Sequence, residues 1–325
     1  MANTELYFKA LSGTLRSNPR EPTEKWIFRN DTCMSVVLYW ITPGGAHAGL
    51  NPDTNNFEEG YPGIALPGNG GIEIYSELGN YFIAMSPSGG LAGVFARDSD
   101  HQGGATMTCA DFLDPGDVGP IPVPDSARPI PPDSPRVVVG CGMAQGLPNV
   151  IVREQFWRLA PDSYSIGPDE TRTVSYTQTS GMESTTSEQQ SLAQSLNVSA
   201  TAGWGPVSAS VSASLSSNTS TFQQVTLSSQ QTTFVSRTLE PASEARTTLY
   251  WQLTEVITVF AKDSNDSLVP QASSITGLQP ILAYAYHPDQ LAEPRRRSRM
   301  TAEERERAPS VDSPGGHTRT ELLQG

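Results

Sequence analysis

The segment Leu196-Asn-Val-Ser-Ala-Thr-Ala-Gly-Trp204, followed by Gly205-Pro206 and then by Val207-Ser-Ala-Ser-Val-Ser-Ala-Ser-Leu215, alternates apolar and small polar residues. Side chains of a strand point alternately to its two sides, so the pattern predicts two amphipathic strands joined by a tight turn. Each arm has nine residues, close to the roughly 9–11 that a tilted strand needs to cross a bilayer. The apolar faces hold Leu196, Val198, Ala200, Ala202 and Trp204 in the first arm, and Val207, Ala209, Val211, Ala213 and Leu215 in the second.

The chain around this hairpin carries no charge from Gln189 to Ser236. A charged side chain on the lipid face of a membrane strand costs about 2–4 kcal/mol, so a membrane-crossing hairpin has to avoid it. The hairpin faces are only weakly apolar because they consist mainly of Ala and Val. Such faces suit a hairpin that is first exposed to water and is later inserted into a membrane. Two other interpretations remain open, namely an ordinary long strand pair and a Ser/Thr-rich adhesive or glycosylated stalk.

Strand signals also occur on both sides of this stretch. Residues 17–115 contain runs of β-branched and aromatic residues separated by Gly, Pro and Asn turns, a spacing typical of a β-sandwich. The sequence therefore predicts an all-β fold, with an N-terminal β-sandwich and an elongated sheet that carries long amphipathic hairpins. The predicted strands are Trp26–Phe28, Val36–Ile41, Ile72–Tyr75, Tyr81–Met85, Leu91–Phe95, Thr173–Ser180 and Thr248–Ala261.

Composition divides the chain into five predicted segments. A Pro-rich stretch separates two strand-rich modules because its prolines favour extended linker conformations, and a polar, charged stretch at the end is typical of disorder. The segments are an N-terminal arm at 1–16, a recognition module at 17–115, a linker at 116–135, a β-rich module at 136–290 and a disordered tail at 291–325.

The charge balance and the residue types exclude several functions. The net charge of −13 disfavours nucleic acid as a partner, and it also disfavours anionic lipid. The cysteines Cys33, Cys109 and Cys141 form no CxxC pair, and only four histidines are present, so we expect no metal site and no cofactor. No nucleophile elbow, HExxH motif or phosphate-binding loop occurs, and we expect that the protein is not an enzyme.

The first sixteen residues lack the continuous apolar core of a signal peptide. We nevertheless expect a protein that is secreted or released and then acts at a target membrane.

Residues Thr171–Lys262 resemble the pore-forming module of the aerolysin-like family, which includes epsilon-toxin and mosquitocidal-toxin relatives. The resemblance lies in the order of a Thr/Ser-rich strand TRTVSYTQTSGMES, a polar strand QSLAQSLNVSATAG, an alternating strand VSASVSASL and a closing strand that follows a proline. It implies a β-rich body that assembles into a homo-oligomeric ring and extends one hairpin into a transmembrane barrel. By the family pattern that hairpin spans Val174 to Ala202 and includes Tyr176, whereas the alternation alone centres it on Trp204.

Residues Ser17–Phe95 resemble the β-domain of the von Hippel–Lindau tumour suppressor. The shared features are the opening NPREP, the strand VVLYW, the turns at YP and PG, and IYS followed by a glycine and an aromatic residue. The resemblance implies a pocket that recognises a hydroxylated proline in a peptide, at Trp40, Tyr61, Ser76, Asn80 and Phe82. Its aromatic residues also suit a plain proline ring or a sugar ring, since both offer a C–H face to an aromatic ring. Asn80 stands where that family has a histidine, and Phe82 stands where it has a tryptophan.

Together these features predict a pore-forming protein that binds a target, oligomerises and inserts a hairpin. The expected partners are membrane lipid or a membrane receptor that presents a glycan or a proline-containing peptide, and further copies of the chain. The alternative is a recognition protein, lectin-like or peptide-binding, that keeps the scaffold and does not insert.

Overall fold

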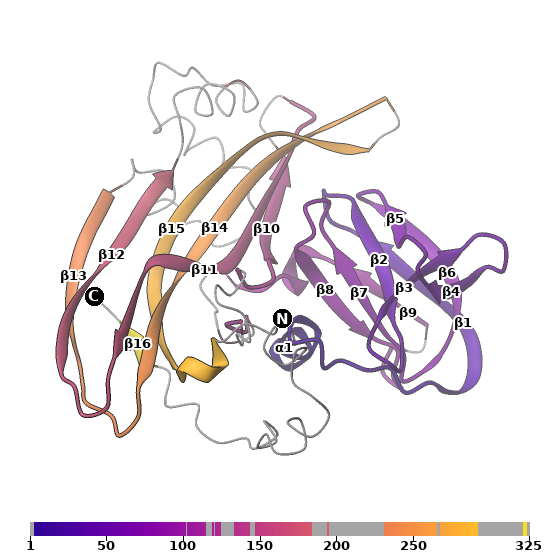
Figure 1. Cartoon of the computed structure of the whole chain (residues 1–325). Coiled ribbons are helices and arrows are strands. Elements are labelled where there is room, and N and C mark those ends of the chain that lie inside the picture. The colour runs from indigo at the N-terminus through magenta and orange to yellow at the C-terminus, as the bar shows by residue number, and fades with distance from the viewer. Residues whose placement is uncertain are drawn as a thin grey trace.

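The structure, a computed structural model, describes residues 3–101, 103–114, 119, 121–124, 133–143, 147–183, 194, 231–264, 267–291 and 321–323. Its regular structure is almost entirely β, with a sandwich on one side and a sheet of long strands on the other (Figure 1). The predicted all-β fold class is therefore confirmed.

The N-terminal sandwich packs a small sheet against one end of a large sheet. Trp26 of the small sheet stacks on Phe82 of the large one, with ring centroids 4.8 Å apart, and Phe28 meets the edge of Phe95 at 5.0 Å. These aromatic pairs form the core between the layers. The small sheet has the order β6 (Gly70–Leu78), β1 (Arg20–Asn30), β9 (Gly104–Met107), and the facing strands are β8 (Leu91–Ala96), β7 (Tyr81–Met85), β2 (Val36–Ile41), β3 (His47–Asn51), β4 (Asn56–Glu59) and β5 (Ile64–Leu66).

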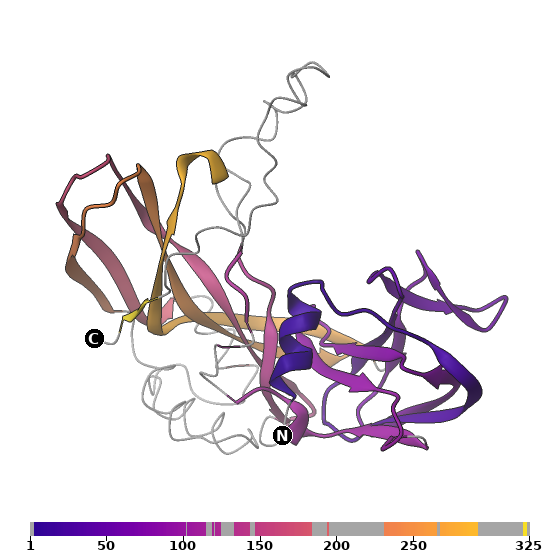
Figure 2. The same ribbon diagram turned by 90° about the horizontal axis from the view of Figure 1, so that it is seen from below.

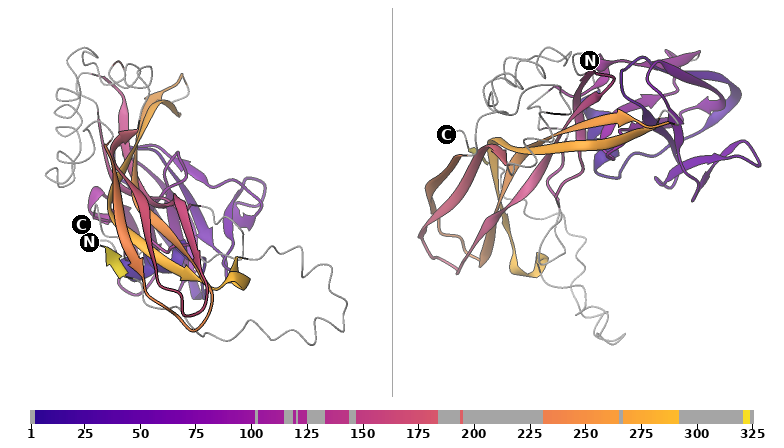
Figure 3. Two further views of the ribbon diagram at one scale, coloured as in Figure 1. Left: turned by 60° about the vertical axis from the view of Figure 1, so that its left-hand side comes forward. Right: turned by 90° about the horizontal axis from the view of Figure 1, so that it is seen from above.

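The other side of the molecule is built from long antiparallel strands that run side by side (Figure 3). The order from the outer edge is β13 (Gln231–Leu239), β12 (Arg172–Glu183), β15 (Leu268–Tyr286), β14 (Arg246–Lys262), β11 (Val150–Ile166) and β10 (Val137–Met143). The first half of β11, Val150–Trp157, and the central part of β14, Thr248–Phe260, are buried on both faces, which fits the many apolar residues in these two stretches.

A single parallel bridge joins the two halves into one 13-stranded sheet. Val137 of β10 pairs with Leu91 of β8, and the Leu91 N–H donates to the Arg136 carbonyl at 2.9 Å. One core cluster then runs across the join, from Trp26 in β1 to Phe260 in β14. The predicted recognition module and the predicted β-rich module thus share a core.

The predicted N-terminal arm contains a helix, α1 (Thr4–Leu11), which lies at the junction of the two halves (Figure 2). Asn3 caps it by accepting a hydrogen bond from the Leu6 N–H at 3.2 Å. Tyr7 is 1% exposed, and its hydroxyl donates to the carbonyls of Ala92, at 2.6 Å, and Asp111, at 2.9 Å. Through Tyr7 the helix ties β8 to the 3-10 turn η1 (Cys109–Asp111).

The last described residues form a short strand, β16 (Glu321–Leu323), which pairs with Ile281–Ala283 of β15. The sequence predicts a disordered tail over 291–325, whereas these three residues are strand. The physical reason is that β12 pairs with β15 only at residues 275–277, so the edge of β15 beyond that point offers free backbone donors and acceptors. A second 3-10 turn, η3 (Pro288–Gln290), follows β15.

Candidate recognition site and membrane strands

Three of the five predicted ligand-binding residues form a hydrogen-bonded chain. The Trp40 indole N–H donates to Asn80 Oδ1 at 3.1 Å, and the Asn80 amide donates to Ser76 Oγ at 3.1 Å. Asn80 and Ser76 are buried, whereas Trp40 is half-buried and reaches the surface. The hydrogen bond to Asn80 therefore orients the partly exposed indole ring of Trp40.

The structure does not bring the other two predicted residues into that chain. Phe82 pairs with Trp40 across β7 and β2 but is 2% exposed, and its ring is held by Trp26 and Phe57 in the core. It supports Trp40 and is closed to a ligand. Tyr61 is half-buried in the loop after β4, where its carbonyl approaches Gly49 of β3 so closely that a side chain at Gly49 would collide with it.

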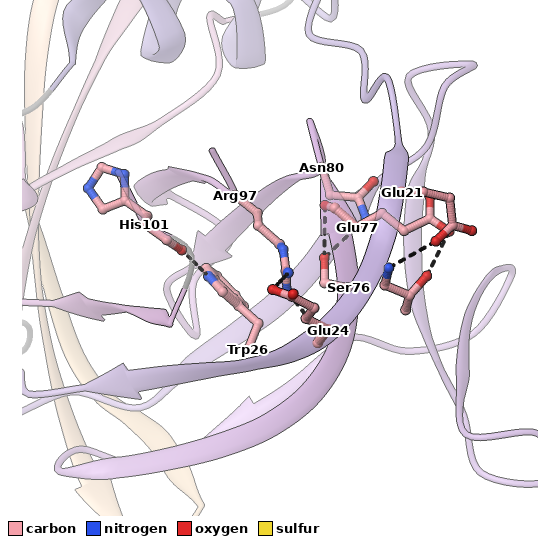
Figure 4. Close-up of polar contacts among 9 residues, drawn as sticks. Glu21, Glu24, Trp26, Ser76, Glu77, Asn80, Arg97 and His101 are labelled. Carbon is pink, nitrogen blue, oxygen red and sulfur yellow. Dashed lines mark hydrogen bonds and ion pairs between the residues drawn. The ribbon is translucent and has the colours of Figure 1, made fainter. Parts of the chain in front are cut away.

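Arg97 lies next to Asn80, and the sequence pattern does not predict its part in this site. Its backbone N–H donates to the Asn80 carbonyl at 2.8 Å, and its side chain has no exposed surface. The guanidinium binds the Glu24 carbonyl at 2.9 Å and the Glu24 carboxylate at 3.3 Å, while Nε has no hydrogen-bond partner among the described residues (Figure 4). In the sequence, Arg97 is the first residue of the polar run Arg-Asp-Ser-Asp, a composition that is typical of an exposed turn.

Figure 4 shows two further polar contacts made by β1 near these residues. Trp26 donates its indole N–H to the His101 carbonyl at 3.0 Å, and Thr23 donates its hydroxyl to Glu77 at 3.2 Å. These contacts link β1 to β6 and to the loop after β8.

The strands that flank the charge-free stretch pair with each other. The register of β12 and β13 runs from Arg172 opposite Leu239 to Ser180 opposite Gln231. On the outer face Ser175 and Ser236 place their hydroxyl oxygens 3.1 Å apart. Phe234 on the same face is 78% exposed. The outer surface of this strand pair is thus polar, with one aromatic residue in contact with water.

Val174 and Tyr176, two residues predicted to enter the membrane, face inward here. Val174 packs with Ile166 and Leu239, and Tyr176 stacks on Tyr250 with ring centroids 4.2 Å apart. Burial raises the pKa of Tyr250 to about 12, so its hydroxyl stays neutral. Thr173–Ser180, predicted as a strand, lies within β12, and burial alternates over residues 173–178.

The remaining ten residues of the predicted insertion hairpin, Leu196, Val198, Ala200, Ala202, Trp204, Val207, Ala209, Val211, Ala213 and Leu215, lie outside the described residues. What the structure does define is where their segment is anchored. β12 ends at Glu183 and β13 begins at Gln231, and the last register pair is Ser180 with Gln231. The end of β12 and the start of β13 therefore lie at the same end of the strand pair.

A buried carboxylate connects the two halves beside a cleft. Glu154 of β11 accepts hydrogen bonds from Ser86 Oγ at 2.5 Å and Ser88 Oγ at 2.7 Å, and its other oxygen lies 3.6 Å from the Arg136 guanidinium. Ser88 and Arg136 also line a cleft of about 520 Å³ against β14 and β15. Gly90 permits this arrangement because a Cβ at that position would lie 2.3 Å from Glu154.

A second buried ionic group lies within the long sheet. Arg153 binds both oxygens of Glu255, at 3.1 and 2.8 Å, and the Gln155 amide donates to Glu255 at 2.7 Å. All three side chains are 2% exposed or less. The triplet Arg-Glu-Gln inside an apolar strand is the sequence signal for both buried groups, because charged residues there need partners.

The chain was compared with protein-family models, curated proteins and solved structures. The chain matches no protein-family model and no curated protein. Among solved structures it is similar to the oligomeric pore-forming toxin pro-Monalysin, at 14% identity over 53% of this chain and 72% of that one, with a TM-score of 0.29. It is also similar to Cry35Ab1, at 8% identity over 78% of this chain and 90% of that one, with a TM-score of 0.32. No helix in the described part of the chain is long and apolar enough to cross a membrane.

Proposed function

We propose that the protein forms β-barrel pores. It binds a target through its N-terminal sandwich, assembles into a ring of identical chains and extends a hairpin from the segment between β12 and β13. The released protein is the soluble form, and the target membrane is where it acts.

The observation that carries this proposal is the anchoring of an almost charge-free segment by a strand pair. β12 and β13 hold residues 184–230 at both ends, and no charged residue occurs from Gln189 to Ser236. A segment attached in this way can extend the existing pair as a longer hairpin without breaking the register already formed. Closing such hairpins into a barrel satisfies every backbone group, which is the condition for crossing lipid.

Charge distribution favours the hairpin centred on Trp204 over the one that spans Val174 to Ala202. Arg237 lies directly opposite Val174 in the register, and Glu183 and Glu188 occur between Val174 and Ala202. Each of these charges is costly on a lipid-facing surface. Val174 and Tyr176 then stay on the body as the base of the hairpin.

Target binding is assigned to the surface around Trp40. Its ring is accessible and oriented by Asn80, and an aromatic face binds the C–H face of a proline or a sugar through dispersion contacts. The receptor class that fits this surface is a membrane glycan or a proline-containing peptide.

The test is dye release from liposomes and from cell membranes, with negative-stain imaging of the same samples. The full chain is compared with a chain shortened after Leu291, since the polar tail can act as a removable segment. Release together with ring-shaped particles is expected. A folded protein that gives neither rings nor release under either condition would instead be the non-inserting recognition molecule, to be screened on glycan and proline-peptide arrays.

A further inference from the structure

The three cysteines are far apart in sequence and meet in one cluster. Cys33 follows β1, Cys109 lies in η1 and Cys141 lies in β10. The Sγ atoms of Cys33 and Cys141 are 3.1 Å apart, and those of Cys109 and Cys141 are 4.0 Å apart. A disulfide bond is about 2.05 Å long, so only a small side-chain movement separates the first pair from bond length.

Each cysteine is held by local structure. Asn30 fixes the turn that carries Cys33 by accepting from the Thr32 hydroxyl at 2.7 Å and donating to the Met34 carbonyl at 2.8 Å. Thr108 and Asp111 cap η1 around Cys109, with the Thr108 N–H donating to the Asp111 carboxylate at 2.7 Å. Cys141 is 1% exposed in the strand that joins the halves. The cluster is therefore a property of the fold and not of mobile side chains alone.

The three thiols differ in reactivity. The hydrogen bond with Cys141 holds the pKa of Cys33 below its usual range, and Cys33 is partly exposed. The hydrogen bond with Cys109 lowers the pKa of Cys141, but the bond with Cys33 and burial outweigh it and raise that pKa to about 12. The thiolate is the reactive form of cysteine, so Cys33 is the thiol that meets an external oxidant first.

We propose that Cys33 and Cys141 form a reversible disulfide that ties the N-terminal sandwich to β10, and that Cys109 is a third thiol able to exchange into it. The proposal is independent of pore formation, since it concerns a covalent link within one folded chain.

The oxidant is a low-molecular-weight disulfide such as oxidised glutathione. The Cys33 thiolate attacks one of its sulfurs, breaks its S–S bond and releases one glutathione thiolate, which takes up a proton. Cys141 then loses its proton and attacks the Cys33 sulfur, which releases the second glutathione. Two protein thiols are oxidised, and one glutathione disulfide is reduced to two thiols. In an exchange step, Cys109 attacks Cys141 and frees Cys33.

The test uses the full chain, incubated with oxidised glutathione or with dithiothreitol, then unfolded, alkylated and digested without reduction for peptide mass mapping. After oxidation we expect one alkylated cysteine, Cys109, and one peptide pair linked through Cys33 and Cys141. The link joins residues 108 positions apart, and it should raise Tm by on the order of 5–10 °C relative to the reduced protein.

Two variants separate this cluster from adventitious oxidation. Cys109→Ser should keep the linked pair and the Tm shift, whereas Cys33→Ser should move the link to Cys109 and Cys141. Three alkylated cysteines after oxidation of the folded wild-type chain, or a link that forms only between chains, would overturn the proposal. Neither result depends on whether a variant folds, because both are read on the wild-type protein.

Discussion

The hydroxyl of Ser86 lies 2.5 Å from a carboxylate oxygen of Glu154. Ser86 belongs to the turn between β7 and β8 in the sandwich, and Glu154 lies in the first half of β11 in the long sheet. Ser88 and Arg136 contact the same carboxylate. One buried acidic group thus holds together segments that come from the two halves of the chain.

Replacing Glu154 with alanine should destabilise the whole protein. The change removes the carboxylate that accepts from both the Ser86 and the Ser88 hydroxyls and the charge that faces Arg136. We therefore expect a loss of about 2–4 kcal/mol in the free energy of unfolding. Chemical denaturation, followed by tryptophan fluorescence, measures it. Glu240→Ala is the control, because Glu240 is exposed and its loss should change stability by less than about 0.5 kcal/mol. Equal effects of the two substitutions would show that the Glu154 contacts do not stabilise the fold.

The pair of Arg153 and Glu255 allows a test of what a buried ion pair contributes. Arg153→Met leaves the Glu255 carboxylate without its bidentate partner, and the expected loss is about 3–5 kcal/mol. The double variant Arg153→Met/Glu255→Met removes both charges and should recover at least half of that loss, because no unpaired charge remains buried. Urea unfolding of the wild type, both single variants and the double variant gives the coupling energy. Additive losses would contradict the interpretation.

Substitutions in the predicted hairpin should separate its two faces. Val198→Asp/Val211→Asp places two charges on the apolar face, and we expect dye release to fall at least tenfold, while thermal unfolding of the soluble protein stays unchanged. The reason is that a charge on the lipid side of a membrane strand costs about 2–4 kcal/mol.

The matched control for this pair is Ser199→Asp/Ser210→Asp, which adds the same charge to the polar face of the same arms. Those positions face a water-filled lumen in the proposed barrel, so release should persist. Inhibition by both double variants to the same degree would mean that net charge, and not the face, decides insertion. Full release by the valine variant would exclude this hairpin as the inserting element.

Trp40→Ala should weaken target binding without affecting assembly on pure lipid. The half-buried indole is the accessible part of the proposed site, and loss of an aromatic anchor commonly reduces affinity tenfold or more. Binding of the fluorescently labelled full chain to cells that bind the wild type measures this. Asn80→Leu should weaken binding as well, because the indole N–H loses its acceptor. Tyr75→Ala is the control, since Tyr75 is 70% exposed on β6 and carries no assigned role; if it reduces binding as much as Trp40→Ala, the site is elsewhere.

Sequence pattern predicts the local part of this architecture well. The runs Val36–Ile41, Tyr81–Met85 and Leu91–Phe95 become β2, β7 and β8 because aromatic and β-branched residues favour a half-buried, pleated surface. The alternation in Thr173–Ser180 gives the buried and exposed faces of β12. Each of these signals lies within a few residues of the chain.

The missed features depend on contacts between distant residues. The sequence pattern does not predict β15 because this strand contains Pro270, Gly277 and Pro280, which disfavour strands. Pairing with β14 along its length outweighs that local preference. The helix α1 is short and charged at Glu5 and Lys9, and what stabilises it is the burial of Tyr7 against β8 and η1. In the candidate site, Asn80 contacts Trp40, which is 40 positions away in the sequence, and Arg97 contacts Glu24, which is 73 positions away. No local period encodes such pairs.

The bridge between Leu91 and Val137 has a consequence for how such a chain can diversify. Val138, Val152 and Phe260 share one core with the sandwich. Replacing residues 17–115 with an unrelated domain would therefore expose apolar surface on β10, β11 and β14 to water. Changes in exposed loops, such as residues 52–55 between β3 and β4, would leave this shared core intact. In proteins whose domains have separate cores, one domain can be exchanged without affecting the next. Here an exchange of the sandwich would also disrupt the packing of the long sheet.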